Sequence, residues 1–580
     1  MEDFLSNISP PRMYSFITFS QLYRNSRPSL EYLKSTLSSF DLKETVLILS
    51  KLNLLLGDKD PGEIYPLQER LIADFIDDYA KNKLNEFKPQ KKEQGIIFNR
   101  HQLLYLIKLS FIECTNKPRF SFSDSRTRHE LGKCCLIAND FIKLLNINEA
   151  SYDKSTSEQK KEVLWKELLP SFELYVPPHI GHSIGRTRII FREILPSIPK
   201  DKSFFDLNSI FKEATSFSID AFISLIVVVV GLYMKRPNEI LSNGSTLFID
   251  YSHLVSNTKI NPADIHRIFD LISIPFDQYK QKILAAKDCD LNYGFLVFKK
   301  YPLARLSEEQ YICLDLNFLL EKLSNGIFWL LSEIFPVSKI GNFRSFWGKL
   351  FEAYIKSFIE SAKSISKDNY TPNPCYINTE EEVADGLFSY GEDIVLLESK
   401  FTTIVQEAKY SSSIEDLIVE IKLKYEKNKK GEWKGYGQLA NNINKLFSVD
   451  STHYCKQINK EKARRVFPLL IIYEHFLNAP FTNYFFNKYF QSLINSASLI
   501  PDINIMPLTI VSIEDFEASQ PFLGQLNKLF QERFAVDPNI KFSFSDFLYA
   551  KYQSDSSLQS EWMQAEYRKC NEEMKKNIFG

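Results

Sequence analysis

Two carboxylates and one lysine in the stretch EEVADGLFSYGEDIVLLESKF are spaced so that they can act together. Asp385 precedes Glu398 by thirteen positions, and Lys400 follows Glu398 by two. A β-hairpin that turns between Ser389 and Asp393 would bring these groups together, because side chains on a strand alternate between its two faces. Glu398 and Lys400 then share a face, and Asp385 lies opposite them on the neighbouring strand. The spacing predicts that three charged groups converge on one point.

These groups have the chemistry needed to hold a hard divalent cation. We expect Asp385 and Glu398 to bind Mg²⁺ or Mn²⁺, with the backbone carbonyl of Ser399 as a further ligand, because such ions prefer oxygen ligands and phosphate oxygens. A bound cation lowers the pKa of a coordinated water and neutralises charge on a phosphate group under attack. Lys400 could act as a clamp for negative charge or as a base, and the sequence leaves both roles open.

Two helices are predicted to position this cluster. Residues 343–359 carry apolar side chains at helical spacing, and Glu352 lies on the border of that apolar stripe. Gly348, one turn earlier, would leave room for a backbone or a phosphate to approach. A second helix is expected over residues 435–447, and it carries Gln438.

The order of these elements resembles the PD-(D/E)XK nuclease superfamily, which includes restriction endonucleases, RecB-type and lambda-type exonucleases and many phage-defence nucleases. The resemblance covers about residues 335–520 and implies a core of a helix, a mixed sheet with the motif, and a further helix. It also implies that Glu352 completes the metal site and that Gln438 faces it. The chain departs from the family pattern at Ala384, where a proline is usual, and at Asn442, where RecB-type members have tyrosine.

A purely structural reading of the motif is also available. Asp385 and Glu398 could be solvent-facing residues of an edge hairpin, with Lys400 as a cross-strand partner whose contribution to stability is small. Against this reading, residues 394–397 (IVLL) are apolar on both faces, which is typical of a strand covered on both sides. Charged residues on a buried strand require a specific reason.

The overall composition indicates a folded protein with several domains. The chain has 580 residues, 44% of them hydrophobic, and a formal net charge of -1, so the whole molecule does not have the basic charge typical of nucleic-acid binding. Charge is nevertheless concentrated locally. Between Glu420 and Arg465, twelve Lys or Arg residues face five Asp or Glu residues, a net charge of +7.

This basic segment surrounds the predicted helix 435–447, with aromatic residues between the charges. Such a surface would hold a polyanion with an affinity that falls as salt rises, whereas the simpler reading is a solvated helix face followed by a lysine-rich loop. The candidate nucleic-acid-binding residues are Lys422, Lys424, Lys429, Lys430, Lys434, Tyr436, Arg464 and Arg465.

The remaining sequence signals argue against other classes of site. The eight cysteines form no C-x-x-C pair, which favours reduced thiols in a cytoplasmic protein over a zinc site. The pair His179 and His182 lacks carboxylates or cysteines at recognisable spacing, and no Walker-type loop is present. The apolar run 221–234 is too short to span a bilayer comfortably, so we expect no membrane partner.

The predicted fold class is mixed α+β, with a large, mostly α-helical N-terminal region followed by an α/β restriction-endonuclease-like core with a mixed central sheet. The expected division is a helical region over 1–200, a helical region with a short β-hairpin over 201–334, a nuclease-like domain over 335–540 and a helical tail over 541–580. Strands are expected over 467–473 and 505–512, within the core domain.

The leading functional hypothesis is a metal-dependent nuclease that favours DNA over RNA, and the family resemblance suggests a phage-defence or restriction setting. Its helical N-terminal region would bind substrate, a partner protein or a second copy of the chain. The alternatives are a non-catalytic scaffold that keeps the nuclease fold to hold nucleic acid or a protein, and a helical interaction protein in which the motif arose by chance. Whether cleavage is internal or from an end does not follow from the sequence.

Overall fold

The structure is a computed structural model, and it describes residues 16–23, 28–57, 61–86, 96–116, 122–142, 156–175, 180–234, 247–288, 292–366, 368–410, 413–552 and 560–579. The chain forms two compact units. One unit combines residues 1–12, 147–207 and 335–569, and the other combines 13–146, 208–334 and 570–580. The mixed α+β class is confirmed, with 63% helix and two mixed sheets.

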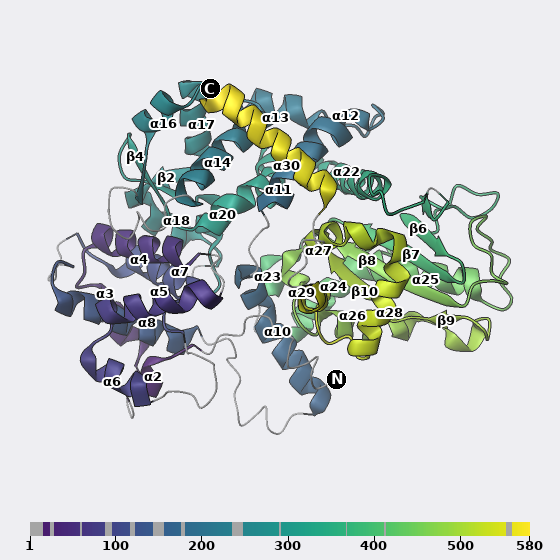
Figure 1. Ribbon diagram of the computed structural model, residues 1–580, viewed down its shortest axis with the longest axis horizontal. Helices are drawn as coiled ribbons and strands as arrows, with labels where there is room; N and C mark the ends of the chain where they lie inside the picture. Colours follow the sequence, from purple (N-terminus) through teal and green to yellow (C-terminus); the bar gives the residue numbers. More distant parts are fainter. Residues whose placement is uncertain are drawn as a thin grey trace. The chain divides into compact units, whose positions relative to one another are not determined.

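The first unit is built on a mixed sheet (Figure 1). The strand order is β10-β8-β7-β6-β5, and β9 also pairs with β8. Strands β7, β8 and β10 run parallel, whereas β6 is antiparallel to both of its neighbours. The strands are β5 (Tyr370–Pro372), β6 (Gly386–Tyr390), β7 (Asp393–Lys400), β8 (Arg465–Ile472), β9 (Asn504–Ile505) and β10 (Thr509–Ser512).

The predicted hairpin is the β6–β7 pair, and its turn is shorter than the predicted one. Tyr390 pairs with Asp393, so that only Gly391 and Glu392 connect the strands. Gly391 has a φ of 75°, a backbone conformation that glycine adopts without the clash of a Cβ atom. Because the turn fixes the register, it also fixes which residues of the two strands face each other.

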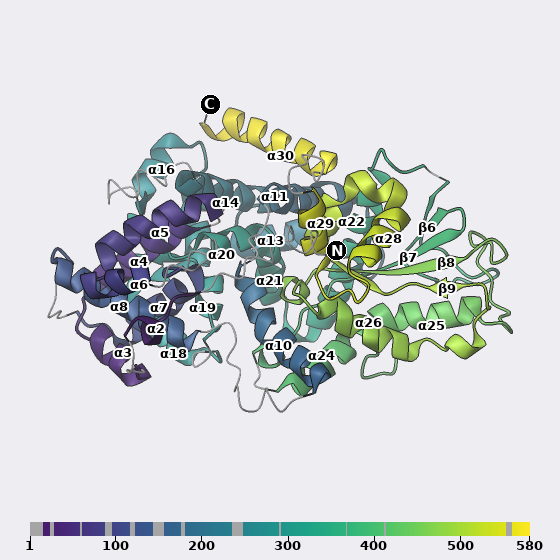
Figure 2. The same cartoon turned by 60° about the horizontal axis from the view of Figure 1, so that its bottom comes forward.

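The two faces of this sheet are covered by different helices (Figure 2). Ile394 and Leu396 of β7 belong to one hydrophobic cluster with Leu439 and Ile443 of α25. Helix α22 lies on the other face, where Phe351 packs against Tyr473. The apolar run of β7 is therefore buried on both sides, as its composition predicts. The main covering helices are α22 (Ile340–Glu360), α24 (Ile414–Tyr425), α25 (Gly435–Phe447), α26 (Thr482–Leu493), α27 (Ile513–Ala518) and α28 (Leu526–Val536).

The segment 156–207 belongs to this same unit. Trp165 of α10 is fully buried, stacks on Phe485 with ring centroids 4.6 Å apart, and donates its Nε1–H to Thr482 Oγ1 at 2.9 Å. The predicted helical region 1–200 is therefore divided between the two units. The elements of this segment are α10 (Ser157–Tyr175), α11 (Ile180–Ile189), the π-helix η1 (Ile190–Ile194) and α12 (Leu195–Ser197).

The second unit is mainly helical and contains a small sheet of order β1-β4-β3-β2. The predicted short β-hairpin in 201–334 is the antiparallel pair β3–β4. Its helices are α2 (Phe19–Leu22), α3 (Leu30–Leu37), α4 (Leu42–Leu56), α5 (Pro61–Phe75), α6 (Asp78–Glu86), α7 (Arg100–Glu113), α8 (Ser125–Phe141), α13 (Leu207–Thr215), α14 (Ile219–Met234), α16 (Tyr251–Asn257), α17 (Pro262–Ile272), α18 (Tyr279–Ala285), α19 (Leu296–Lys300), α20 (Leu316–Leu320) and α21 (Asn325–Ile334). Its strands are β1 (Phe248–Asp250), β2 (Ser273–Pro275), β3 (Leu303–Arg305) and β4 (Gln310–Cys313).

The remaining elements are short connections and the C-terminal helices. The predicted helical tail over 541–580 contains α29 (Phe544–Tyr552), α30 (Glu561–Met574) and the π-helix η9 (Lys575–Phe579). The apolar run 221–234 lies in α14. In the part of the chain that the structure describes, no single helix is long and apolar enough to cross a membrane, and the bent pair α13 and α14 passes that test only by length and composition.

Candidate active site

The register of the β6–β7 hairpin places Asp385 opposite Glu398. Gly386 pairs with Leu397, so the next residue on each strand faces the other. Asp385 Oδ2 accepts hydrogen bonds from the backbone N–H of Ser399 at 2.7 Å and from Ser399 Oγ at 2.9 Å. The hairpin therefore holds this carboxylate across the end of β7, close to the second carboxylate of the motif.

Glu398 and Lys400 form a close ion pair at the end of β7. Lys400 Nζ lies 2.5 Å from Glu398 Oε1, and the Glu398 side chain has no exposed surface. Its second oxygen, Oε2, is buried and accepts no hydrogen bond from the described residues. Burial, followed by the charge of Asp385, raises the pKa of Glu398 to about 8.

Glu352 completes the acidic cluster from the helix on the opposite face of the sheet. Burial and the charge of Asp385 raise the pKa of Glu352 to about 7, while Lys400 opposes this rise. The ring of the preceding residue, Phe351, lies 6.0 Å from that of Phe401, which directly follows Lys400, so this part of α22 lies at the carboxyl end of β7. A Cβ atom added at Gly348, one turn earlier, would meet nothing within 4 Å, which agrees with the expected room for an approaching group.

Lys400 responds to the same carboxylates in the opposite direction. Burial disfavours its charged form, but Glu398, Asp385 and Glu352 together outweigh burial and raise its pKa above the ordinary value for lysine. In this arrangement the charged form of Lys400 is favoured. The geometry is compatible with both roles that the sequence left open.

Helix α25 covers the face of β7 that carries Glu398 and Lys400. Gln438 is half-buried near the start of this helix. Asn442, one turn later, donates its Nδ2–H to the carbonyl of Val383 at 2.7 Å and accepts a hydrogen bond from Tyr376 Oη at 3.2 Å. Asn442 thus fixes the segment that leads into Asp385. The sequence marked Asn442 only as a departure from the family pattern and did not suggest this role.

The residues of the cluster fit a divalent cation chemically. Three carboxylates gather beside one lysine, two of them have raised pKa values, and one buried oxygen of Glu398 lacks a hydrogen bond. Among the described residues, no three His, Cys, Asp or Glu side chains are already arranged as ligands of one ion. The oxygens of Asp385 and Glu398 instead contact Ser399 and Lys400, so binding a cation requires small side-chain movements.

The basic segment divides into two groups. The first lies around the turn 426–434 between α24 and α25, where Lys422 lies over the ring of Tyr489 on α26 at 5.1 Å. The predicted residues at or near this turn are Lys422, Lys424, Lys429, Lys430 and Lys434, of which Lys422, Lys429 and Lys430 are exposed.

Three other predicted nucleic-acid contacts lie elsewhere. Arg465 forms a two-point contact with Asp393 at the amino end of β7, with distances of 2.6 and 3.0 Å, and Arg464 is its neighbour. Tyr436 is fully buried and donates its hydroxyl to Glu426 at 2.8 Å, so its ring is not available to stack on a base. Only the lysines of the turn and its flanks remain as candidate nucleic-acid contacts.

Of the two histidines considered as a metal pair, His179 lies outside the described residues. His182 is buried, and its Nδ1 is 3.2 Å from Glu517 Oε2. It belongs to a separate polar network.

Comparisons of this chain with models of protein families, with curated proteins and with solved structures give no match.

Proposed function

We propose that this chain is a metal-dependent nuclease of the PD-(D/E)XK type that hydrolyses phosphodiester bonds, with DNA as the favoured substrate. The observation that carries the proposal is the position of Asp385, held by two hydrogen bonds from Ser399 between the paired residues Glu398 and Lys400 at the end of β7. The order of elements also supports it, because α22, the strands β5, β6 and β7, and then α25 follow one another along the chain, as in the core that the motif suggests.

Each residue of the cluster has a distinct role in this proposal. Asp385, Glu398, Glu352 and the Ser399 carbonyl would hold Mg²⁺ or Mn²⁺, which activates a water and neutralises phosphate charge when it is bound. Lys400, kept protonated by its carboxylate neighbours, stabilises negative charge on the phosphate group that is attacked.

The turn 426–434 supplies a positively charged surface in the same unit. Asn428 Oδ1 accepts hydrogen bonds from the backbone N–H groups of Lys430 and Glu432 at 3.0 Å, which gives the turn a fixed shape. Lys427 lies over the ring of Trp433 at 4.4 Å. We propose that the exposed lysines of this turn contact the phosphate backbone and position the substrate.

A cleavage assay with matched variants tests the proposal. Purified protein is incubated with linear DNA, circular DNA and RNA in Mg²⁺ or Mn²⁺, beside the variants Asp385→Asn and Glu398→Gln. The control is Glu392→Gln, the same chemical change at the exposed turn of the same hairpin. Cleavage by the wild type and by Glu392→Gln, with none by the two motif variants, supports the proposal. Equal cleavage by Asp385→Asn would falsify the catalytic assignment.

A second candidate is a non-catalytic nuclease-fold scaffold that binds nucleic acid or a partner protein. The observation that favours it is the Glu398–Lys400 ion pair, which engages both motif residues without a cation. This candidate predicts that the wild type retards DNA in a gel without cleaving it, and that Asp385→Asn binds equally well.

A further inference from the structure

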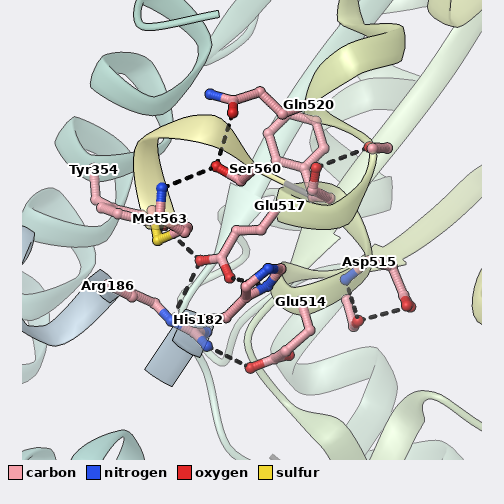
Figure 3. Close-up of polar contacts among 12 residues, drawn as sticks. His182, Arg186, Tyr354, Glu514, Asp515, Glu517, Gln520, Ser560 and Met563 are labelled. Atoms are coloured by element: carbon pink, nitrogen blue, oxygen red, sulfur yellow. Dashed lines mark hydrogen bonds and ion pairs between the residues drawn. The ribbon is translucent and has the colours of Figure 1, made fainter. Parts of the chain in front are cut away.

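A buried carboxylate links the sheet to the helix that carries Glu352 (Figure 3). Glu517, on α27 directly after β10, has no exposed surface. Its Oε1 accepts the hydroxyl hydrogen of Tyr354 at 2.6 Å, and Tyr354 is itself fully buried on α22. This contact therefore connects the end of β10 to a position two residues beyond Glu352.

The α11 helix holds Glu517 from the other side. Arg186 Nε lies 3.3 Å from Glu517 Oε1, and Arg186 Nη2 lies 2.6 Å from Glu514 Oε1. His182 Nδ1 lies 3.2 Å from Glu517 Oε2. Arg186 and Glu517 both have 1% exposure or less, but Arg186 Nε and Glu517 Oε2 make no hydrogen bond with the described residues. The hydroxyl of Tyr354 is therefore the group that orients the Glu517 carboxylate by a hydrogen bond.

A network of this kind is costly to bury. Moving charges out of water costs free energy that the ion pairs only partly recover, and apolar residues of similar volume would serve stability as well or better. Arg186 Nη1 and Glu514 Oε2 are buried without a hydrogen bond from the described residues, so the pairing is incomplete. One established use of such groups is to select a single geometry, which points to a need for precision at this place.

The network restricts the rotation of α22 about its own axis. Side chains extend about 5–6 Å from the axis of a helix, so a rotation of about 20° displaces a side-chain end by roughly 2 Å. Glu352 follows Phe351 on this helix, and the ring of Phe351 lies 6.0 Å from that of Phe401, the residue directly after Lys400. A displacement of that size would carry a carboxylate out of the coordination distance of a cation.

We infer that Tyr354 and Glu517 are positioning residues that hold Glu352 in the metal site through the rotation of α22. The inference rests on the proposed function, and it adds a role for a network that lies outside the motif. Tyr354 and Glu517 touch neither cation nor substrate; they act through Glu352.

The test is a double-mutant cycle on Mn²⁺ affinity, measured by electron paramagnetic resonance of free Mn²⁺ on the full chain. Tyr354→Phe removes one hydroxyl and should weaken Mn²⁺ binding about tenfold. In the Glu352→Gln background, the same Tyr354→Phe change should have no further effect, because the residue through which it acts is absent. Glu517→Gln keeps an acceptor for the tyrosine hydroxyl, so it should weaken binding less than Tyr354→Phe.

The matched control is Tyr425→Phe. Tyr425 is also fully buried in this unit, but its hydroxyl has no hydrogen bond from the described residues, so the change should leave Mn²⁺ affinity unaltered. If Tyr354→Phe binds Mn²⁺ as the wild type does, or weakens it equally with and without Glu352, the inference is wrong and the nuclease proposal stands. If the wild type neither binds Mn²⁺ nor cleaves nucleic acid, both are wrong.

Discussion

Asp385 accepts two hydrogen bonds from Ser399, one from the backbone N–H at 2.7 Å and one from Oγ at 2.9 Å. The backbone donor is present whatever the side chain at position 399, whereas the second donor depends on serine. The hairpin therefore positions the motif aspartate mainly through its backbone.

The variant Ser399→Ala should keep most of the proposed activity. It removes one donor to a carboxylate, and the remaining backbone bond still directs Asp385, so we expect cleavage to fall by about tenfold or less. Initial rates on one DNA substrate measure the effect beside Asp385→Asn. A loss as complete as that of Asp385→Asn would mean that Ser399 takes part in the chemistry itself.

Divalent cations should stabilise the folded protein. A ligand that binds only the native state adds about 2.7 kcal/mol when its concentration is one hundred times its Kd. We expect Mn²⁺ to raise the melting temperature of the wild type and of Glu392→Gln, but not that of Asp385→Asn, in differential scanning fluorimetry. An equal rise in Asp385→Asn would place the bound cation elsewhere.

Trp165→Ala should destabilise the sheet-containing unit strongly. The change removes a fully buried ring, its stacking on Phe485 and its hydrogen bond to Thr482. The expected loss is about 3–5 kcal/mol in urea unfolding monitored by circular dichroism. Trp329→Ala, which removes a ring that is 45% exposed, is the matched control and should cost less. Similar losses for both variants would mean that residues near 165 are not part of the core.

His101 should make the second unit sensitive to acid. Burial lowers the pKa of His101 to about 3, although its Nε2–H donates to the Asn292 carbonyl at 3.1 Å, a contact that partly opposes this shift. Because the folded pKa lies below the ordinary 6.5, only the unfolded chain takes up a proton between these values, and stability falls as pH drops from about 6.5 toward 3.

At pH 5 this histidine should cost about 2 kcal/mol relative to pH 7, since each pH unit corresponds to about 1.4 kcal/mol. His101→Gln should unfold with a weaker dependence on pH over the same range, measured by urea titration at pH 7, 6 and 5. Parallel pH profiles for the two proteins would show that His101 does not contribute.

The lysines of the turn 426–434 should dominate the salt dependence of DNA binding. Lys429→Gln with Lys430→Gln should lower affinity at low salt and reduce the slope of log K against log salt by about two, one for each lost phosphate contact. Arg464→Gln, which lies outside this turn and next to the amino end of β8, is the control and should leave the slope unchanged. Fluorescence anisotropy in a catalytically inactive Asp385→Asn background measures the affinity and the slope. If Arg464→Gln reduces the slope and the two lysine variants do not, the binding surface lies at the amino ends of the strands.

Local sequence patterns were sufficient to predict the helices and strands around the motif. The apolar run of β7, the glycine at its turn and the helical stripe of α22 each reflect contacts between residues close in sequence, and all three are present in the structure. Tyr436 shows where such reading fails. The sequence grouped Tyr436 with the neighbouring lysines because of its position. It lies three residues before Leu439 and seven before Ile443, which are both buried. At this spacing Tyr436 shares their side of α25.

Contacts between distant parts of the sequence could not be predicted. The pairing of Trp165 with Phe485, and of Arg186 with Glu514, joins residues more than three hundred positions apart, and no local pattern specifies such partners. The division of residues 1–200 between two units follows from these contacts. The same reasoning explains why the positioning network around Glu517 was not found in the sequence.

The shared core of Trp165 and Phe485 also has a consequence for biosynthesis. At translation rates of about 5–20 residues per second, α10 leaves the ribosome roughly 20–70 s before the strands that complete its core. During that interval its apolar face has no native partner, which makes it a natural client for chaperones. A nascent chain in this state also lacks the finished sheet, so any toxic cleavage activity would be delayed until synthesis of the polypeptide is nearly complete.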